Sequence, residues 1–326
     1  MTVKVAAVQP ESFHGAEEHK NVDRALAYVD EAAALGAQLV CFPEGYPGPY
    51  SGPLDSGGHL PQSPIQALCE KARDRRVYIS AGNLEPSHEL ADTCFITHKL
   101  IAPDGQVLAN YRRVQPNHPC LNAHLMGGRL HVLPGNEFVV LPTELGRIGL
   151  LICSELFVPE LARILMLRGA DIILAPGGGT HHPTHTRVRE AWLCVARARA
   201  VENLVYVVVT QNLFYRGVTG RTAVVGPEGT LAEKSDAGLA MAELDLSRLD
   251  ELRSRYYDEE LLETPGDPSK VWRTRPGQCH DRRPELYGDL VRPQPDAFDY
   301  RYDRRGLDRW REEYEKIRRS SRPSLG

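Results

Sequence analysis

The stretch Arg147-Ile-Gly-Leu-Leu-Ile-Cys153-Ser-Glu155-Leu-Phe-Val-Pro159-Glu160 indicates how this chain folds. Its apolar run predicts a buried strand, which leads through a polar turn into a helix that begins with Pro159. A residue at this turn projects from the carboxyl end of a strand, where α/β sheets bind their ligands. Cys153 there can gain thiolate character from a nearby base or from helix-end amides, so it is a candidate nucleophile. A small cysteine packed in the core fits the same pattern.

The same alternation of short apolar runs and amphipathic segments extends over most of the chain. We predict strands at Val3–Val8, Gln38–Phe42, Val77–Gly82, Asp92–Ile101, Val107–Tyr111, Ile148–Ile152, Ile172–Ala175, Val205–Thr210, Thr222–Val225 and Met241–Leu244, and helices at Asn21–Leu35, Pro64–Arg75, Pro159–Arg168 and His185–Glu202. This order predicts a layered α/β fold.

The composition excludes several classes of protein. The 326 residues carry a net charge of −4, which gives no reason to expect nucleic acid or an anionic membrane as a partner. No apolar run approaches the ~20 residues of a membrane helix, and the N-terminus lacks a signal-peptide pattern. The 7 cysteines are scattered. Free thiols suit a reducing compartment, so we expect a cytoplasmic protein.

The character of the sequence changes near Leu252. The rest of the chain is rich in Arg, Tyr, Asp and Pro, with a charged helix expected at Leu307–Arg319. We therefore divide the chain into a body, residues 1–250, and an arm, residues 251–326, that packs on the body or on a partner subunit. A disordered tail is the alternative.

A second candidate catalytic group lies in Leu39-Val-Cys-Phe-Pro43-Glu44-Gly-Tyr46. Glu44 directly follows a buried strand. A poorly solvated glutamate beside a thiol can act as a general base. An exposed loop glutamate would produce the same local pattern.

Several motifs together resemble the nitrilase-like carbon–nitrogen hydrolases. Each is weak alone, but their order and spacing are specific. They are Val5-Ala-Ala-Val-Gln9, Phe42-Pro43-Glu44, Ala102-Pro-Asp-Gly105 followed by Tyr111-Arg-Arg113, Pro134-Gly135, Ile152-Cys153-Ser-Glu155, Ala198-Arg199-Ala-Val-Glu202-Asn203 and Arg283-Pro284-Glu285-Leu-Tyr287.

The resemblance implies a four-layer α-β-β-α sandwich that forms homodimers or larger homo-oligomers. It implies that Glu44 is the general base and Cys153 the nucleophile of an enzyme without a cofactor. Two positions depart from the family pattern. Arg113 stands where the family has a catalytic lysine, and no acid lies between Gln106 and Asn136 to supply a second glutamate. Arginine keeps the positive charge but does not deprotonate, so it can stabilise an oxyanion without moving a proton.

The loss of an acid predicts a more positive site and an anionic substrate or intermediate. We expect the substrate to contact Tyr46, His118, Cys120, Glu155, His181 and His182. Cys120 is the nearest positional match to the missing glutamate. These histidines, with His124, His185, Cys120 and Cys153, could alternatively bind a metal, because imidazole and thiolate suit zinc. Solvent-exposed loop histidines are the simpler interpretation.

The sequence thus predicts a thiol-dependent hydrolase of a carbon–nitrogen bond in a small molecule, with an amide more expected than a nitrile. Three alternatives stay open at this point. They are acyl transfer, cyclisation or a lyase-type reaction at the same cysteine, a metal-dependent enzyme, and a non-catalytic binding scaffold.

Overall fold

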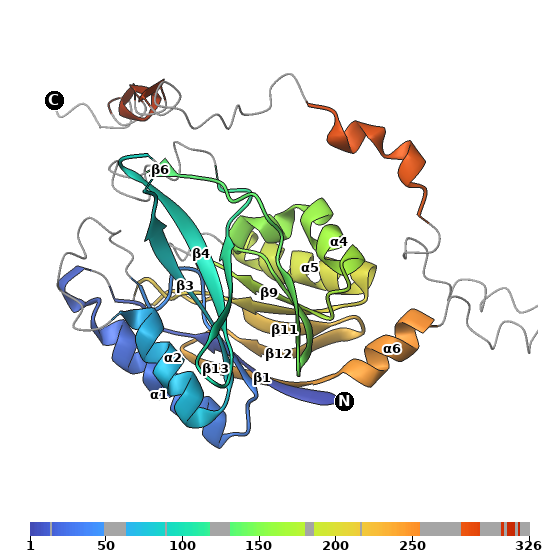
Figure 1. The fold of residues 1–326 in the computed structure, drawn as a ribbon, viewed down its shortest axis with the longest axis horizontal. Coiled ribbons are helices and arrows are strands. Elements are labelled where there is room, and N and C mark those ends of the chain that lie inside the picture. Colours follow the sequence, from blue (N-terminus) through green and yellow to red (C-terminus); the bar gives the residue numbers. More distant parts are fainter. Residues whose placement is uncertain are drawn as a thin grey trace, which may run out of the picture.

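The computed structural model describes residues 1–13, 15–48, 63–88, 90–117, 131–179, 186–215, 217–254, 282–293, 308–309, 312–316 and 319. Two sheets form the centre of the molecule. The first has the order β13-β1-β2-β3-β4-β5, with β6 paired to β4, and the second has the order β12-β11-β10-β9-β8-β7. Figure 1 shows α1 and α2 against one sheet and α4 and α5 against the other, which confirms the α-β-β-α sandwich.

The strands of the first sheet are β1 (Thr2–Gln9), β2 (Leu39–Cys41), β3 (Tyr78–Pro86), β4 (Thr93–Ile101), β5 (Val107–Arg112), β6 (His131–Val132) and β13 (Gly238–Asp245). Those of the second are β7 (Val140–Thr143), β8 (Gly146–Leu150), β9 (Ile172–Pro176), β10 (Tyr206–Thr210), β11 (Thr222–Gly226) and β12 (Gly229–Lys234). The α-helices are α1 (Lys20–Ala34), α2 (Pro64–Arg75), α4 (Pro159–Leu167), α5 (Thr186–Asn203) and α6 (Leu246–Ser254).

All four helices predicted in the body are present, with ends within a residue or two of the prediction. Strands β6, β7 and β12 were not predicted. β12 has only two apolar residues, Leu231 and Ala232, between a turn and two charged residues, and β7 contains a proline, so neither has the buried apolar run that marked the other strands. These two strands are the edges of the second sheet.

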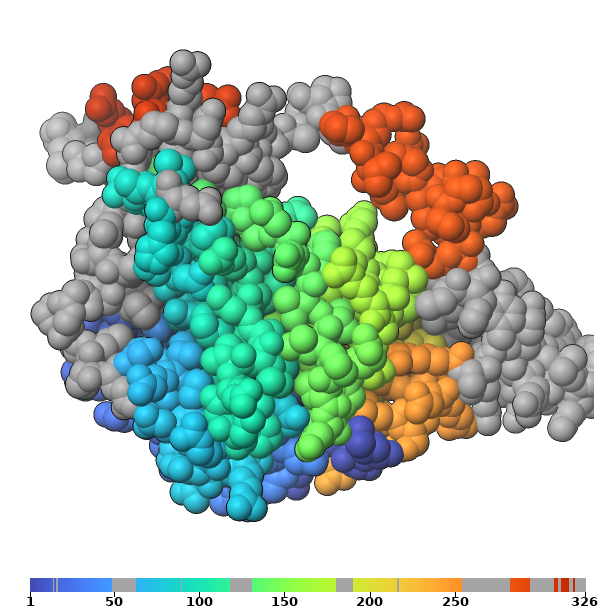
Figure 2. Space-filling model, viewed as in Figure 1, coloured from blue at the N-terminus to red at the C-terminus, as the bar shows by residue number. Residues whose placement is uncertain are grey.

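Three apolar layers hold the sandwich together. One lies between the two sheets and includes Val5, Leu100, Ile148 and Leu174. The other two lie under α1 and α2 and under α4 and α5. On the face seen in Figure 2, the surface of β4 and β5 is continuous with that of residues 131–150.

The body continues beyond residue 250 because α6 is tied to it. Arg253 donates hydrogen bonds to the carbonyl oxygens of Leu204 and Ala170 and forms an ion pair of 2.6 Å with Asp171. Short 3-10 turns follow at Pro284–Leu286 and Gly288–Val291, and they are exposed. That the remaining residues form an arm stays a prediction. Within the described part of the chain, no helix combines the length and apolar character needed to cross a bilayer.

Candidate active site

Cys153 lies at the carboxyl edge of the second sheet. Strand β8 ends at Leu150, and Cys153 opens a short 3-10 helix, Cys153–Phe157, that leads into α4. Its φ angle is +56°, a left-handed conformation that costs a residue with a Cβ on the order of 1–3 kcal/mol. Such strain is stored where surrounding structure fixes it, and functional sites are where it clusters. The backbone conformation thus favours a functional cysteine over a core-filling one.

Glu44 is brought to this cysteine from the first sheet. It follows β2, and its backbone is anchored to the second sheet on both sides of the peptide unit. The Glu44 N–H donates to the carbonyl oxygen of Gly177 over 3.3 Å, and the side-chain amide of Asn212 donates to the Glu44 carbonyl oxygen over 2.9 Å. The carboxylate is 14% exposed. These bonds tie the Glu44 turn to the segments that follow β9 and β10 in the second sheet.

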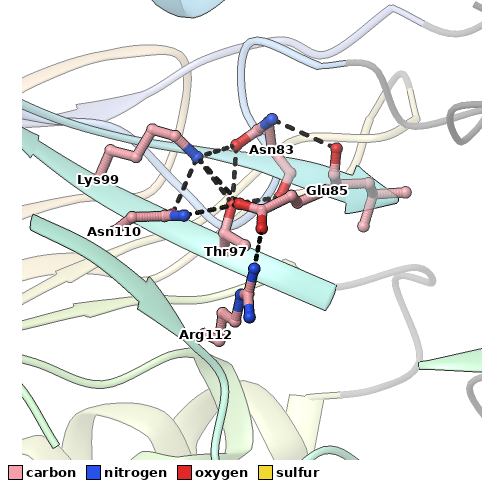
Figure 3. Close-up of polar contacts among 7 residues, drawn as sticks. Asn83, Glu85, Thr97, Lys99, Asn110 and Arg112 are labelled. Carbon is pink, nitrogen blue, oxygen red and sulfur yellow. Dashed lines mark hydrogen bonds and ion pairs between the residues drawn. The ribbon is translucent and has the colours of Figure 1, made fainter. Parts of the chain in front are cut away.

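The neighbouring residues Arg112 and Arg113 point to opposite sides of the first sheet, because side chains alternate along a strand. Figure 3 shows Arg112 directed to Glu85 on the outer face, beside Asn83, Thr97, Lys99 and Asn110. The Arg112 guanidinium also lies 4.1 Å from the centre of the Phe95 ring. Only Arg113 therefore reaches the site between the sheets.

Arg113 is 1% exposed and contacts both catalytic segments. Its Nη1 donates to Glu44 Oε1 over 3.0 Å, and its Nη2 donates to Asn117 Oδ1 over 3.2 Å and to the Ser154 hydroxyl. Burial opposes the charge of the guanidinium, but attraction to Glu44, Cys153 and Glu155 outweighs it and raises the pKa of Arg113. The side chain is a permanent cation beside the thiol.

The surroundings of the Cys153 thiol favour its protonated form in the resting protein. Burial and the negative charge of Glu44 raise its pKa to about 12, against the opposing effects of Arg113 and the backbone N–H of Gly178. Gly178 approaches closely, since a Cβ there would lie 2.8 Å from Glu44 Oε2 and 3.9 Å from Cys153 Sγ. Glu44 lies beside the thiol and is placed to accept its proton, so the expected thiolate character depends on this base and stays a prediction.

The arrangement of an acid, a cation and a thiol at the meeting edges of two sheets agrees with the family comparison. The sequence model of the carbon–nitrogen hydrolase family matches residues 4–254. The chain belongs to the carbon–nitrogen hydrolase family. It is therefore an enzyme of that class.

Similar proteins of this family include amidases. The omega-amidase NIT2 of Homo sapiens is 29% identical over 248 residues, which cover 72% of this chain and 86% of that protein. An amidase from Nesterenkonia sp. is 25% identical, with a TM-score of 0.62 over 80% of this chain and 95% of that one. The fold also matches Nit3 of Saccharomyces cerevisiae, with a TM-score of 0.64, 24% identity and coverage of 77% and 93%.

Glu155 of this carbon–nitrogen hydrolase, expected to contact substrate, is fully buried beneath the site. Its Oε2 accepts from the Tyr111 hydroxyl over 2.8 Å and from the Ile152 N–H over 2.7 Å, and its Oε1 accepts from the Gln115 N–H over 2.8 Å. Burial raises the pKa of Glu155, while Arg113 and these donors oppose the rise. The carboxylate thus joins the segment of Arg113 to the residue before the nucleophile.

Tyr46, the other described residue expected to contact substrate, is also fully buried. Its hydroxyl donates to the Asn21 carbonyl oxygen over 3.1 Å, and its ring stacks on Phe42 at 5.5 Å between centroids. This geometry favours support of the Glu44 turn over contact with a ligand.

His118, Cys120, His181 and His182 lie outside the described residues, so their proposed contacts stay predictions. Among the residues that the structure does describe, no three His, Cys, Asp or Glu side chains gather in a way that could hold a metal ion. The metal hypothesis concerns the loops that carry the four residues named above.

Four residues that shape the site were not predicted: Asn117, Ser154, Gly178 and Asn212. Ser154 directly follows Cys153 and Asn117 directly precedes His118, but a short polar residue in a turn carries no distinct chemical signal. Asn212 acts on a backbone atom 168 residues away. Only folding brings that pair together.

Proposed function

We propose that Cys153, Glu44 and Arg113 together hydrolyse the amide bond of a small molecule. The observation that supports this most directly is the position of one carboxylate, Glu44, which forms a hydrogen bond of 3.0 Å with the guanidinium and lies, like the thiol, beside Gly178. A solved structure of a mutant of the Nesterenkonia amidase carries the acetamide moiety of fluoroacetamide covalently on its active-site cysteine. A cysteine that accepts such a group supports the same role for Cys153.

The reaction would proceed in two halves. Glu44 takes the thiol proton as the sulfur attacks the carbonyl carbon, and the carbonyl oxygen becomes an oxyanion near Arg113. The proton then passes to the departing nitrogen, the carbon–nitrogen bond breaks, and ammonia or an amine leaves behind a thioester. Water attacks the thioester with Glu44 again as the base, and the acid product leaves with the thiol restored.

The test is a screen of small amides, nitriles, ureas and hydrazides for release of ammonia or amine. We expect amides to be hydrolysed, with no turnover by Cys153→Ala and a loss of about 100-fold or more in kcat for Glu44→Gln. Exposed Cys194 supplies the matched control, Cys194→Ala, which should keep full activity. Full activity in Cys153→Ala would refute the proposal, and turnover of nitriles alone would refute its choice of bond.

We also propose a homo-oligomer in a reducing, cytoplasmic setting. The outer layer formed by α4 and α5 exposes Phe157, Leu167 and Val201 at 38%, 46% and 50%, which suits contact with a second copy. Light scattering of Val201→Lys should then show a smaller particle than the parent protein.

The described cysteines are all free thiols, which accords with a reducing compartment and is testable by cell fractionation.

A further inference from the structure

We propose that Asn117 and Ser154 are positioning residues that hold the Arg113 guanidinium beside Cys153 throughout the catalytic cycle. The inference rests on the proposed function, because it assigns these two residues to the cation of that reaction. Neither residue needs to touch the substrate.

The side chains of Arg113, Asn117 and Ser154 each contact the other two. Arg113 Nη2 donates to Asn117 Oδ1 over 3.2 Å and to the Ser154 hydroxyl oxygen, and the Ser154 hydroxyl donates to the same Asn117 oxygen over 2.7 Å. A serine hydroxyl has one hydrogen and two lone pairs. Its hydrogen is directed to Asn117, so its oxygen is free to accept from Arg113.

The two terminal nitrogens of the guanidinium bond different kinds of partner. Among the residues that the structure describes, Nη1 contacts the ionisable Glu44 at 3.0 Å, whereas Nη2 contacts the uncharged Asn117 and Ser154. When Glu44 takes the thiol proton it becomes neutral, and its attraction for the guanidinium falls. Asn117 and Ser154 do not titrate, so their hold on Nη2 is unchanged. The cation therefore stays in place at the step in which the oxyanion forms.

The position of Ser154 gives the contact a second consequence. Ser154 directly follows Cys153 in the same 3-10 turn, so the bond to Nη2 ties Arg113 to the turn that carries the nucleophile. Asn117 extends the tie to the segment after β5, where Glu155 already binds the Gln115 N–H. The distance between sulfur and cation is thereby fixed by local bonds.

The pair also suits an arginine in particular. A guanidinium is a planar fork that can donate from Nη1 and Nη2 in different directions, whereas a lysine amine is a single point. A lysine amine at the Nη1 position would contact Glu44 but would not contact Asn117 or Ser154, which would then bond only each other. The two residues should therefore matter when residue 113 is arginine and lose their influence when it is lysine.

The test is a double-mutant cycle that combines Asn117→Ala or Ser154→Ala with Arg113→Lys. Alone, each alanine variant should lower kcat by about 10- to 100-fold with KM changed less than about 3-fold, since a small displacement of a catalytic group acts on the reaction step. In the Arg113→Lys background the same change should cost less than about 2-fold, because coupled residues are not additive. Asn110→Ala, on the outer face of β5, is the matched control and should leave kcat unchanged.

The alkylation rate of Cys153 by iodoacetamide gives a readout that needs no turnover. Arg113 lowers the thiol pKa, so loosening it should move the pH at which Cys153 reacts upward in each alanine variant, but not in Asn110→Ala. Equal losses in the parent and in the Arg113→Lys background would overturn the proposal, as would an unshifted alkylation profile in folded variants with unchanged melting temperature. If the parent protein hydrolyses no amide, the proposed function fails, while the alkylation series still decides the role of the pair.

Discussion

Replacing Glu155 with glutamine tests whether this acid positions the site or touches the substrate. The parent carboxylate accepts three hydrogen bonds, two on Oε2 from Tyr111 and Ile152 and one on Oε1 from Gln115. A glutamine oxygen can serve the first two donors. Its amide nitrogen then faces the Gln115 N–H, so a donor meets a donor, and the amide group belongs to a fully buried side chain.

The magnitude follows from one unsatisfied buried donor, about 1–3 kcal/mol of the free energy of unfolding. Part of this is offset, because glutamine avoids the cost of burying a charge, a cost shown by the raised pKa of Glu155. We therefore expect a net loss of about 1–2 kcal/mol. At roughly 2–4 °C per kcal/mol, the melting temperature should fall by about 2–8 °C.

The pH dependence of this difference has a definite sign. The pKa of Glu155 is raised, so the stability it contributes is fully present below the unfolded-state value of about 4.3 and declines as the pH rises toward the folded-state value. Glutamine does not titrate. The stability gap between the parent and Glu155→Gln should thus be widest at acid pH and narrow as the pH rises.

Steady-state kinetics with the best amide from the screen provide the functional assay. Displacement of Arg113 relative to Cys153 should lower kcat by about 100-fold per ångström, with little change in KM. The matched control is Glu243→Gln, at an exposed position of β13. An unchanged kcat with an increased KM would refute the positioning role and support direct contact of Glu155 with substrate. An unchanged melting temperature at all pH values would refute the account of its hydrogen bonds.

Three further outcomes are expected. Without substrate, alkylation of Cys153 should be slow at neutral pH and should accelerate as the pH rises toward its pKa of about 12. The exposed Cys194 should therefore be alkylated before Cys153. Mass spectrometry of the labelled peptides measures both rates, and faster labelling of Cys153 at neutral pH would contradict this expectation. Gly178→Ala places a methyl group 2.8 Å from Glu44 Oε2 and should lower kcat at least 10-fold, by roughly the effect of a small misplacement, and normal kcat in this variant would contradict the close approach. Asn212→Ala removes the bond to the Glu44 carbonyl oxygen and should lower kcat and the melting temperature together, so a change in neither would show that the Glu44 turn is held by other contacts.

The sequence alone indicated the fold and the candidate reacting groups. Apolar runs of strand length alternate with helical periodicity, and both patterns are local, so α1, α2, α4, α5 and the buried strands could be predicted from neighbouring residues. Cys153 and Glu44 were identifiable because each follows such a run directly. The edge strands β7 and β12 were missed because an edge is only partly buried and lacks that signal.

The tertiary structure decided what the charges in the site do. Alternation along the strand places the side chains of Arg112 and Arg113 on opposite faces of the first sheet. Which of these two faces meets the second sheet depends on how the sheets pack. The same packing buries Glu155 and Tyr46, which the sequence placed against substrate, and it raises the pKa of the Cys153 thiol through burial and the charge of Glu44. Burial and charge proximity arise between segments far apart in the chain, so no local pattern encodes them.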